Sequence, residues 1–177
     1  MRKSALTGAL LAALLTGAGT MSAWAQADQP RQIAAIVQWR ALAAGPPDNP
    51  VCYVTHQPGA VLQAGQRVGP RPMLMVAWRP AKASANVVTV FAAYRFKAGS
   101  EAILEFSPRL SYKLFTNRDT AWATSAEDDA AIVEGMRGAQ FVVVRGTNEA
   151  GAPMADTYSL IGFTAAAASA IQTCPPR

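Results

Sequence analysis

Short runs of β-branched and aromatic residues, separated by Gly- and Pro-containing segments, occupy most of this 177-residue chain. Branched and aromatic side chains pack well on a pleated surface, so runs of this kind favour extended strands. Two further segments carry helix signals. Together the pattern predicts a mainly β fold, an antiparallel β-sandwich or half-barrel of about eight or nine short strands with one internal and one C-terminal helix.

The expected strands lie at 33–42, 51–56, 73–78, 87–96, 102–106, 112–115, 121–123, 141–145 and 157–161. The run 73–78 is continuously apolar, which is consistent with a strand buried on both faces. The run 87–96 is the longest candidate. The runs 102–106 and 112–115 predict a hairpin across the turn at Ser107, Pro108 and Arg109.

Helix signals mark two segments. Ser125 is an expected N-cap, acidic residues follow it at 127–129, and Gly138 is expected to close that helix. The C-terminal segment is rich in Ala, and we expect Thr164 to cap its helix. Four of its residues share one helical face, namely Phe163, Ala167, Ile171 and Cys174.

The first 27 residues predict a cleavable signal peptide. Arg2 and Lys3 precede an apolar core of about 14 residues, and two overlapping small-x-small sites place cleavage after Ala25 or Ala27. The apolar core is shorter than the roughly 20 residues of a membrane span, so a retained anchor is the less favoured alternative. We expect one domain over 28–177, located in the periplasm, associated with the outer membrane or secreted.

The two cysteines, Cys52 and Cys174, both lie in the expected mature chain. Two thiols in one small exported domain usually pair, because the compartment is oxidising. On the expected C-terminal helix Cys174 shares the apolar face, where a strand bearing Cys52 can meet it. We therefore predict a Cys52–Cys174 disulfide, with two free buried thiols as the alternative.

The charge pattern is mildly basic and uneven. Without residues 1–27 the chain keeps 14 basic and 11 acidic side chains, which does not suggest a nucleic-acid-binding protein. Residues 28–118 carry 11 basic and four acidic side chains, whereas residues 119–177 carry three and seven. A basic side of this kind could meet an anionic envelope or host surface component, or the two faces simply differ in their solvated charges.

Residue patterns for catalysis and cofactor binding are weak or absent in the sequence. His56 is the only histidine, so it alone could serve a Ser-His or Cys-His mechanism, and one His does not supply a zinc centre of ordinary type. Glu101 and Glu105 fall on one strand face roughly 13 Å apart by strand rise, beyond the separation that glycosidases use. We expect no catalytic residues, no metal and no cofactor.

Basic residues alternate with aromatic ones in three places: Trp78-Arg79, Tyr94-Arg95-Phe96-Lys97 and Tyr112-Lys113. Such segments can form a stacking platform for sugars or bases. Alternating strands give the same pattern when aromatic side chains point inward and charges point outward. The candidate ligand surface therefore consists of Arg79, Arg95, Lys97 and Lys113.

Several blocks of the chain resemble the invasion-associated locus B family of exported bacterial proteins. The blocks are 51–58, 94–101, 114–115 with 121–122, 134–138 with 142–147, and 156–166. The resemblance implies a β-rich periplasmic or surface-exposed domain, linked in some pathogens to entry into host cells, notably erythrocytes. It brings no catalytic residues. Of the Gly-Asp-Trp that the family often has near its mature start, only Trp39 is present, and the chain has two cysteines where some members have four.

These observations lead to one main functional hypothesis with two alternatives. The main hypothesis is a monomeric, non-enzymatic envelope protein that binds a surface component. The first alternative is a periplasmic housekeeping or envelope-stress factor with no host ligand. The second is a hydrolase of glycan or cell wall, which the weak carboxylate pattern disfavours. A ligand surface should gather basic residues on one face, whereas a housekeeping domain can scatter them.

Overall fold

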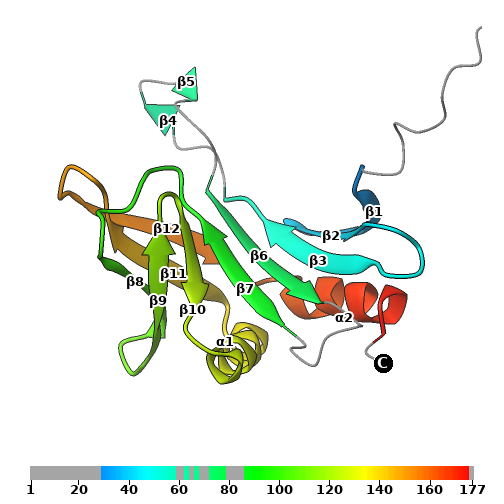
Figure 1. Ribbon diagram of the computed structural model, residues 1–177. Helices are drawn as coiled ribbons and strands as arrows, with labels where there is room; N and C mark the ends of the chain where they lie inside the picture. The colour runs from blue at the N-terminus through cyan, green and yellow to red at the C-terminus, as the bar shows by residue number, and fades with distance from the viewer. Residues whose placement is uncertain (1–28, 59–61, 64–65, 68–71, 79–85, 176–177) are drawn as a thin grey trace, which may run out of the picture.

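The computed structural model describes residues 29–58, 62–63, 66–67, 72–78 and 86–175. The expected signal peptide and its cleavage sites lie outside these residues. Ten strands form one continuous antiparallel sheet in the order β1-β2-β3-β6-β7-β10-β9-β8-β11-β12, and β4 and β5 form a separate pair (Figure 1). The mainly β prediction with one internal and one C-terminal helix is confirmed, as one open sheet.

The bounds of the elements are as follows: β1 Arg31–Ile36, β2 Trp39–Ala44, β3 Val51–His56, β4 Leu62–Gln63, β5 Gln66–Arg67, β6 Met73–Trp78, β7 Val87–Phe91, β8 Glu101–Ser107, β9 Leu110–Asn117, β10 Thr120–Ala123, α1 Ala126–Gly138, β11 Phe141–Thr147, β12 Pro153–Ser159 and α2 Phe163–Thr173.

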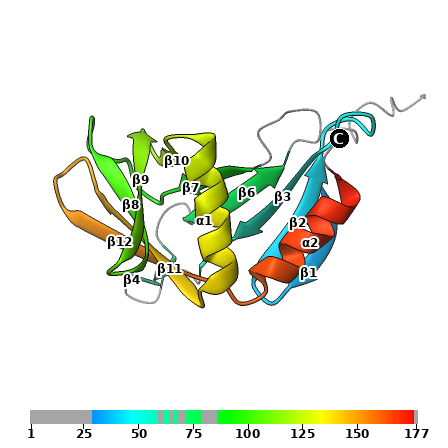
Figure 2. The ribbon, with the colours of Figure 1, turned by 90° about the horizontal axis from the view of Figure 1, so that it is seen from below.

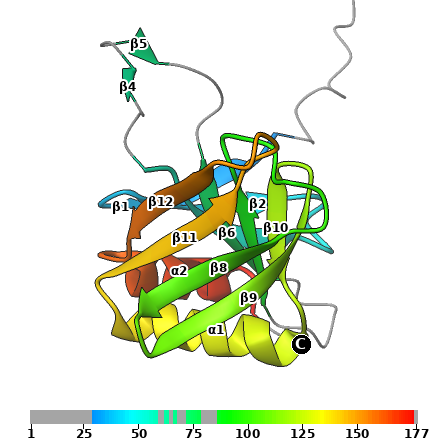
Figure 3. The ribbon, with the colours of Figure 1, turned by 90° about the vertical axis from the view of Figure 1, so that its left-hand side faces the viewer.

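The two helices cover one face of the sheet, here called the inner face (Figures 1 and 2). Helix α1 packs against β7 and β10, and α2 packs against β1, β2 and β3. Alternate strand residues point to this face and form the core, for example Val54, Val76 and Val90. Figure 3, which views the molecule from the β12 end, shows β12, β11, β8 and β9 as successive strands.

Helix α1 begins where the sequence predicts. The Ser125 side chain accepts a hydrogen bond from the Asp128 backbone N–H at 3.1 Å. The Val88 backbone N–H donates to Asp129 Oδ1 at 2.7 Å, which ties the first turn of the helix to β7. Gly135 lets the helix approach the sheet closely, because a Cβ there would lie 2.8 Å from the Phe106 ring.

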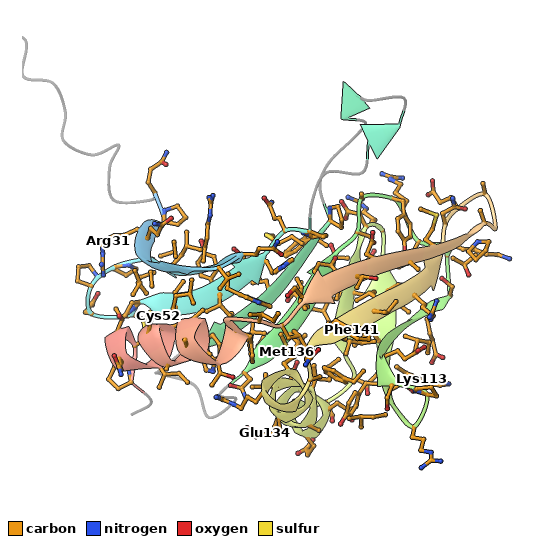
Figure 4. The ribbon with its side chains drawn as sticks, turned by 180° about the vertical axis from the view of Figure 1, so that it is seen from behind. Arg31, Cys52, Lys113, Glu134, Met136 and Phe141 are labelled. Carbon is orange, nitrogen blue, oxygen red and sulfur yellow. A yellow bond between two sulfur atoms is a disulfide. The ribbon has the colours of Figure 1, made fainter. Side chains whose placement is uncertain are left out.

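Helix α2 is joined covalently to the sheet. Cys52 on β3, labelled in Figure 4, and Cys174 after α2 form a disulfide with their Cα atoms 5.9 Å apart. Both side chains are buried. The apolar helical face predicted from the sequence is largely buried, and Phe163 is fully buried.

Four local expectations were wrong. The segment 33–42 is not one strand, because the chain reverses at Val37 and Gln38 between β1 and β2. The strand expected over 87–96 ends at Phe91. Strand β6 is buried on one face only, since its residues alternate between buried and half-buried. The Thr164 side chain does not cap α2, because the N-cap residue is Gly162, in a left-handed conformation with no side-chain cap.

Candidate functional site

The basic residues of the expected ligand surface are exposed and mostly paired with acids. Arg95 Nη1 lies 3.6 Å from Glu149 Oε1, and Lys113 Nζ lies 2.9 Å from Glu101 Oε2. Lys97 is exposed, and its backbone N–H donates to the Thr147 carbonyl at 2.9 Å. Arg79 lies outside the described residues. Two of the three described residues of this surface are therefore paired with an acid, which offsets their positive charge.

The outer face of β8, β9 and β11 carries alternating charges. Ile103 on β8 has Lys113 of β9 as its partner on one side and Arg145 of β11 on the other. Arg145 Nε donates to Glu105 Oε2 at 3.0 Å. Glu101 and Glu105, the carboxylates considered for glycoside cleavage, each pair with a cation from a neighbouring strand. Both carboxylates are thus held in ion pairs on the outer face of the sheet.

Two aromatic rings stack on the same outer face. Phe115 on β9 and Trp122 on β10 are cross-strand partners, with ring centroids 5.2 Å apart and planes 27° from parallel. Phe115 is 49 % exposed, and Glu101 lies opposite it on β8. We call these two rings with the Lys113–Glu101 ion pair the aromatic patch; Figure 4 labels Lys113, which lies on β9.

The aromatics that the sequence proposed for stacking point elsewhere. Trp78 and Phe96 are buried in the core, and the Tyr94 ring packs edge-on against Phe96. The patch was missed because Phe115 and Trp122 are neighbours only through the β9–β10 register. The usable sequence signal was their alternation with the core residues Leu114 and Ala121.

A cleft of about 410 Å³ lies between the end of β12 and the start of β2. Phe141 and Ile161 line it and are 52 % and 60 % exposed. His56 also lines it but is buried, and its Nε2 donates to Gln38 Oε1 at 2.8 Å. A second cleft of about 460 Å³ lies on the other side of Gln38.

His56 belongs to a row of buried rings. Its imidazole packs against Trp39 and edge-on against Tyr158, with centroids 5.3 and 5.8 Å away. Burial lowers the pKa of His56, so the neutral form is favoured. His56 Nδ1 has no hydrogen-bond partner among the described residues, and the same holds for the hydroxyls of Tyr94 and Tyr158.

Tyr94, Asp156 and Tyr158, which interact electrostatically with one another, have raised pKa values. Burial raises the pKa of Tyr94 to about 12, with the Asp156 carboxylate adding to the shift. Burial also raises the pKa of Tyr158 and of Asp156. These shifts favour the protonated forms of the two tyrosines and Asp156, whereas His56 is favoured in its unprotonated, neutral form.

Two kinds of feature are absent from the described part of the chain. No group of three or more His, Cys, Asp or Glu residues there could hold a metal ion. No helix within those residues is long and apolar enough to cross a membrane.

The comparisons with known proteins agree with this architecture. The model of the family described as invasion associated locus B (IalB) protein matches residues 39–170. The crystal structure of invasion associated protein b from Bartonella henselae is similar with a TM-score of 0.59 at 14 % identity, covering 80 % of this chain and 96 % of that chain. No curated protein sequence matches the chain.

Proposed function

Because the chain belongs to the invasion-associated locus B family, we propose that it is an exported, non-enzymatic binding protein of the bacterial envelope. In this proposal the signal peptide over 1–27 is removed and residues 28–177 act as a monomeric domain in the periplasm or at the cell surface. The buried disulfide supports export, because such bonds persist in oxidising compartments.

The observation that carries the binding role is the aromatic patch. A stacked, half-exposed ring pair on an open sheet face offers flat apolar area, and the adjacent ion pair offers hydrogen-bond donors and acceptors. A sugar ring has matching chemistry, with C–H groups on one face and hydroxyls around its rim. We propose that the ligand is the glycan part of an envelope or host surface component.

Because the charges are paired, they favour binding by ring stacking and hydrogen bonds over electrostatic attraction of an anionic ligand. An anionic ligand would have to displace Glu101 or Glu149 from its cation, which weakens the gain from each contact. Arg95, Lys97 and Lys113 would then position or orient a ligand at the rim. The proposal predicts weak dependence of binding on salt concentration.

Binding to a panel of envelope polysaccharides and host-type glycans tests the patch. Trp122→Ala and Phe115→Ala should each lower affinity by tenfold or more, because each removes one of the two stacked rings. Leu110→Ala is the matched control, since Leu110 is an exposed apolar residue at the start of β9, the strand that carries Phe115. Equal affinity of all three variants would reject the patch as the ligand surface.

Export and host entry need separate tests. N-terminal sequencing of a periplasmic extract should find Gln26 or Asp28 at the start, and a retained Met1 would contradict processing. Deletion of the gene should be compared with and without host cells. A defect confined to growth without host cells would favour the housekeeping alternative over a host ligand.

A further inference from the structure

Strand β12 forms one edge of the ten-stranded sheet, and its pairing with β11 is regular. Seven consecutive residue pairs join the two strands without a register shift. Just beyond the two ends of the pair, the Leu160 N–H donates to the Gln140 carbonyl at 2.8 Å and the Asn148 N–H donates to the Ala152 carbonyl at 3.0 Å. Both bonds join even-numbered residues.

In an antiparallel ladder, a residue directs its N–H and its C=O to the same side, and successive residues alternate. Even-numbered residues of β12 therefore bond to β11, and the odd-numbered ones face away from the sheet. Ser159 confirms this alternation, because its carbonyl accepts a hydrogen bond from Trp39 Nε1 at 3.0 Å. Pro153, which has no N–H, also falls on the outward side.

The outward backbone groups of Ala155 and Thr157 have no partner among the described residues. The opposite edge is different, since β1 has a register shift between Gln32 and Ala34 and packs against α2. A straight edge with free N–H and C=O groups is a template for one more strand. The groups that would recognise an occupant are therefore those that pair with an extended peptide.

Asp156 gives the edge a charge preference. It lies between the two outward residues along the strand, and its half-buried side chain points to the face that carries Tyr158. No hydrogen bond or ion pair joins it to a described residue. Burial raises its pKa, as expected for a carboxylate without a counter-ion. A cation on a strand placed opposite Asp156 would supply that counter-ion.

The same charge argues against a second copy of this chain. A symmetric antiparallel pairing of Ala155 in one copy with Thr157 in the other would place Asp156 directly opposite its equivalent. Like charges at such a position are destabilising. Beyond Thr157, the cleft lined by Phe141 and Ile161 lies beside Ser159 and can take an apolar side chain.

We propose that an extended segment of another protein adds to the sheet along β12, with a basic residue opposite Asp156 and an apolar residue in the adjacent cleft. This site is separate from the aromatic patch and does not rest on the glycan proposal. Ala155 and Thr157 would hold the peptide backbone. Asp156, Phe141 and Ile161 would select its side chains.

Panning of phage-displayed random heptapeptides on the whole mature protein tests the proposal, with Thr157→Pro as the counter-selection. Proline removes the outward N–H but no bond to β11, so this variant should keep the wild-type melting temperature within a few degrees. Peptides with a central Lys or Arg should be enriched on the wild type. Their synthetic, acetylated forms should bind Thr157→Pro at least tenfold more weakly.

A double-mutant cycle between the peptide and Asp156 tests the charge preference. Replacing the central Lys of an enriched peptide by Gln should lower affinity about tenfold on the wild type and leave it unchanged on Asp156→Asn. If Thr157→Pro does not fold, peptides N-methylated at the amides that face β12 replace it, and they should lose binding to the wild-type protein.

Three results would overturn the proposal. The first is no enrichment on the wild type over the counter-selection. The second is peptide affinity that survives both Thr157→Pro and N-methylation. The third is a concentration-dependent dimer that Thr157→Pro abolishes, which would make a second copy the occupant.

Hydrogen exchange tests whether the Thr157 N–H is free. The Thr157 amide should exchange much faster than the Tyr158 amide, which bonds to β11. Equal protection of the two amides would contradict a free edge.

Discussion

Phe163 packs edge-on against Trp39 with ring centroids 5.0 Å apart, and both side chains are fully buried. The contact joins the start of α2 to β2, two elements from opposite ends of the chain. Sequence reasoning placed Phe163 in the core because it shares a helical face with Ala167. The same reasoning put a cap at Thr164, where the structure shows an exposed side chain.

We expect Phe163→Ala to lower the free energy of unfolding by about 3–5 kcal/mol, because it leaves a cavity at a fully buried site. Thr164→Ala is the matched control and should change it by less than about 0.5 kcal/mol, since no cap is lost. Urea denaturation of both variants measures the difference. A loss of about 1 kcal/mol at Thr164 would restore the capping role.

His56 should make stability depend on pH. The fold lowers the pKa of His56 below its unfolded value of about 6.5, so the unfolded chain binds the proton more tightly. The contribution of His56 is therefore complete above that pH and is lost as the pH falls towards the folded pKa. Asp129 and Asp156 act in the opposite direction, because the fold raises their pKa values.

Comparison with His56→Gln isolates this effect, because the carboxylates are common to both proteins. The free energy of unfolding of the wild type should fall more steeply than that of the variant between pH 7.5 and pH 5. Chemical denaturation at a series of pH values measures both slopes. Parallel slopes would show that His56 keeps its ordinary pKa in the fold.

At the level of elements, strand existence could be predicted and some strand ends could not. Strand β3 and helix α1 agree with their sequence signals, because Pro residues and a Ser cap mark their ends. The β1–β2 turn was missed because Val37, a β-branched residue, adopts φ +55°, where Asn or Gly would have signalled a turn. Strand β7 was predicted too long, since its pairing with β6 ends at Phe91 and the chain bends at Ala93 and Tyr94.

Gly162 is where the chain passes from β12 into α2, and it permits no side chain. Its φ is +93°, and a Cβ there would lie 2.9 Å from the Ile36 carbonyl oxygen. We expect Gly162→Ala to lower the free energy of unfolding by more than roughly 1–2 kcal/mol, which is the cost of the left-handed backbone conformation alone for a residue with a Cβ. Gly99→Ala is the control, with φ +72° and open space around it. If both variants lowered the melting temperature equally, a steric clash at Gly162 would be contradicted.

For the molecule as a whole, the fold could be predicted further than the site. Alternating runs determine which residues face the helices, so the core and the helix α2 face could be anticipated. The aromatic patch and the free edge of β12 depend on strand order, which places β10 beside β7 and β9, and β11 beside β8. No local pattern encodes such long-range neighbours, and ion pairs such as Glu105–Arg145 follow from them.

The disulfide links these long-range neighbours covalently. Cys52 and Cys174 are 122 residues apart and close almost the whole described domain into one loop. Such a link restricts the unfolded chain, and its removal should lower the free energy of unfolding by about 2–5 kcal/mol. Urea denaturation of a Cys52→Ala/Cys174→Ala double variant measures the loss. A reductant should destabilise the wild type similarly and leave the double variant unchanged.

Burial adds a kinetic expectation to this thermodynamic one. Because both cysteine side chains are almost fully inaccessible, a reductant should cleave the bond only as fast as the domain opens. The intact mass of the exported protein should be two hydrogen atoms below that of the reduced chain, with no thiol alkylated under native conditions. Two thiols that react without denaturant or reductant would show that α2 is held to β3 by packing alone, and the double variant would then match the wild type in stability.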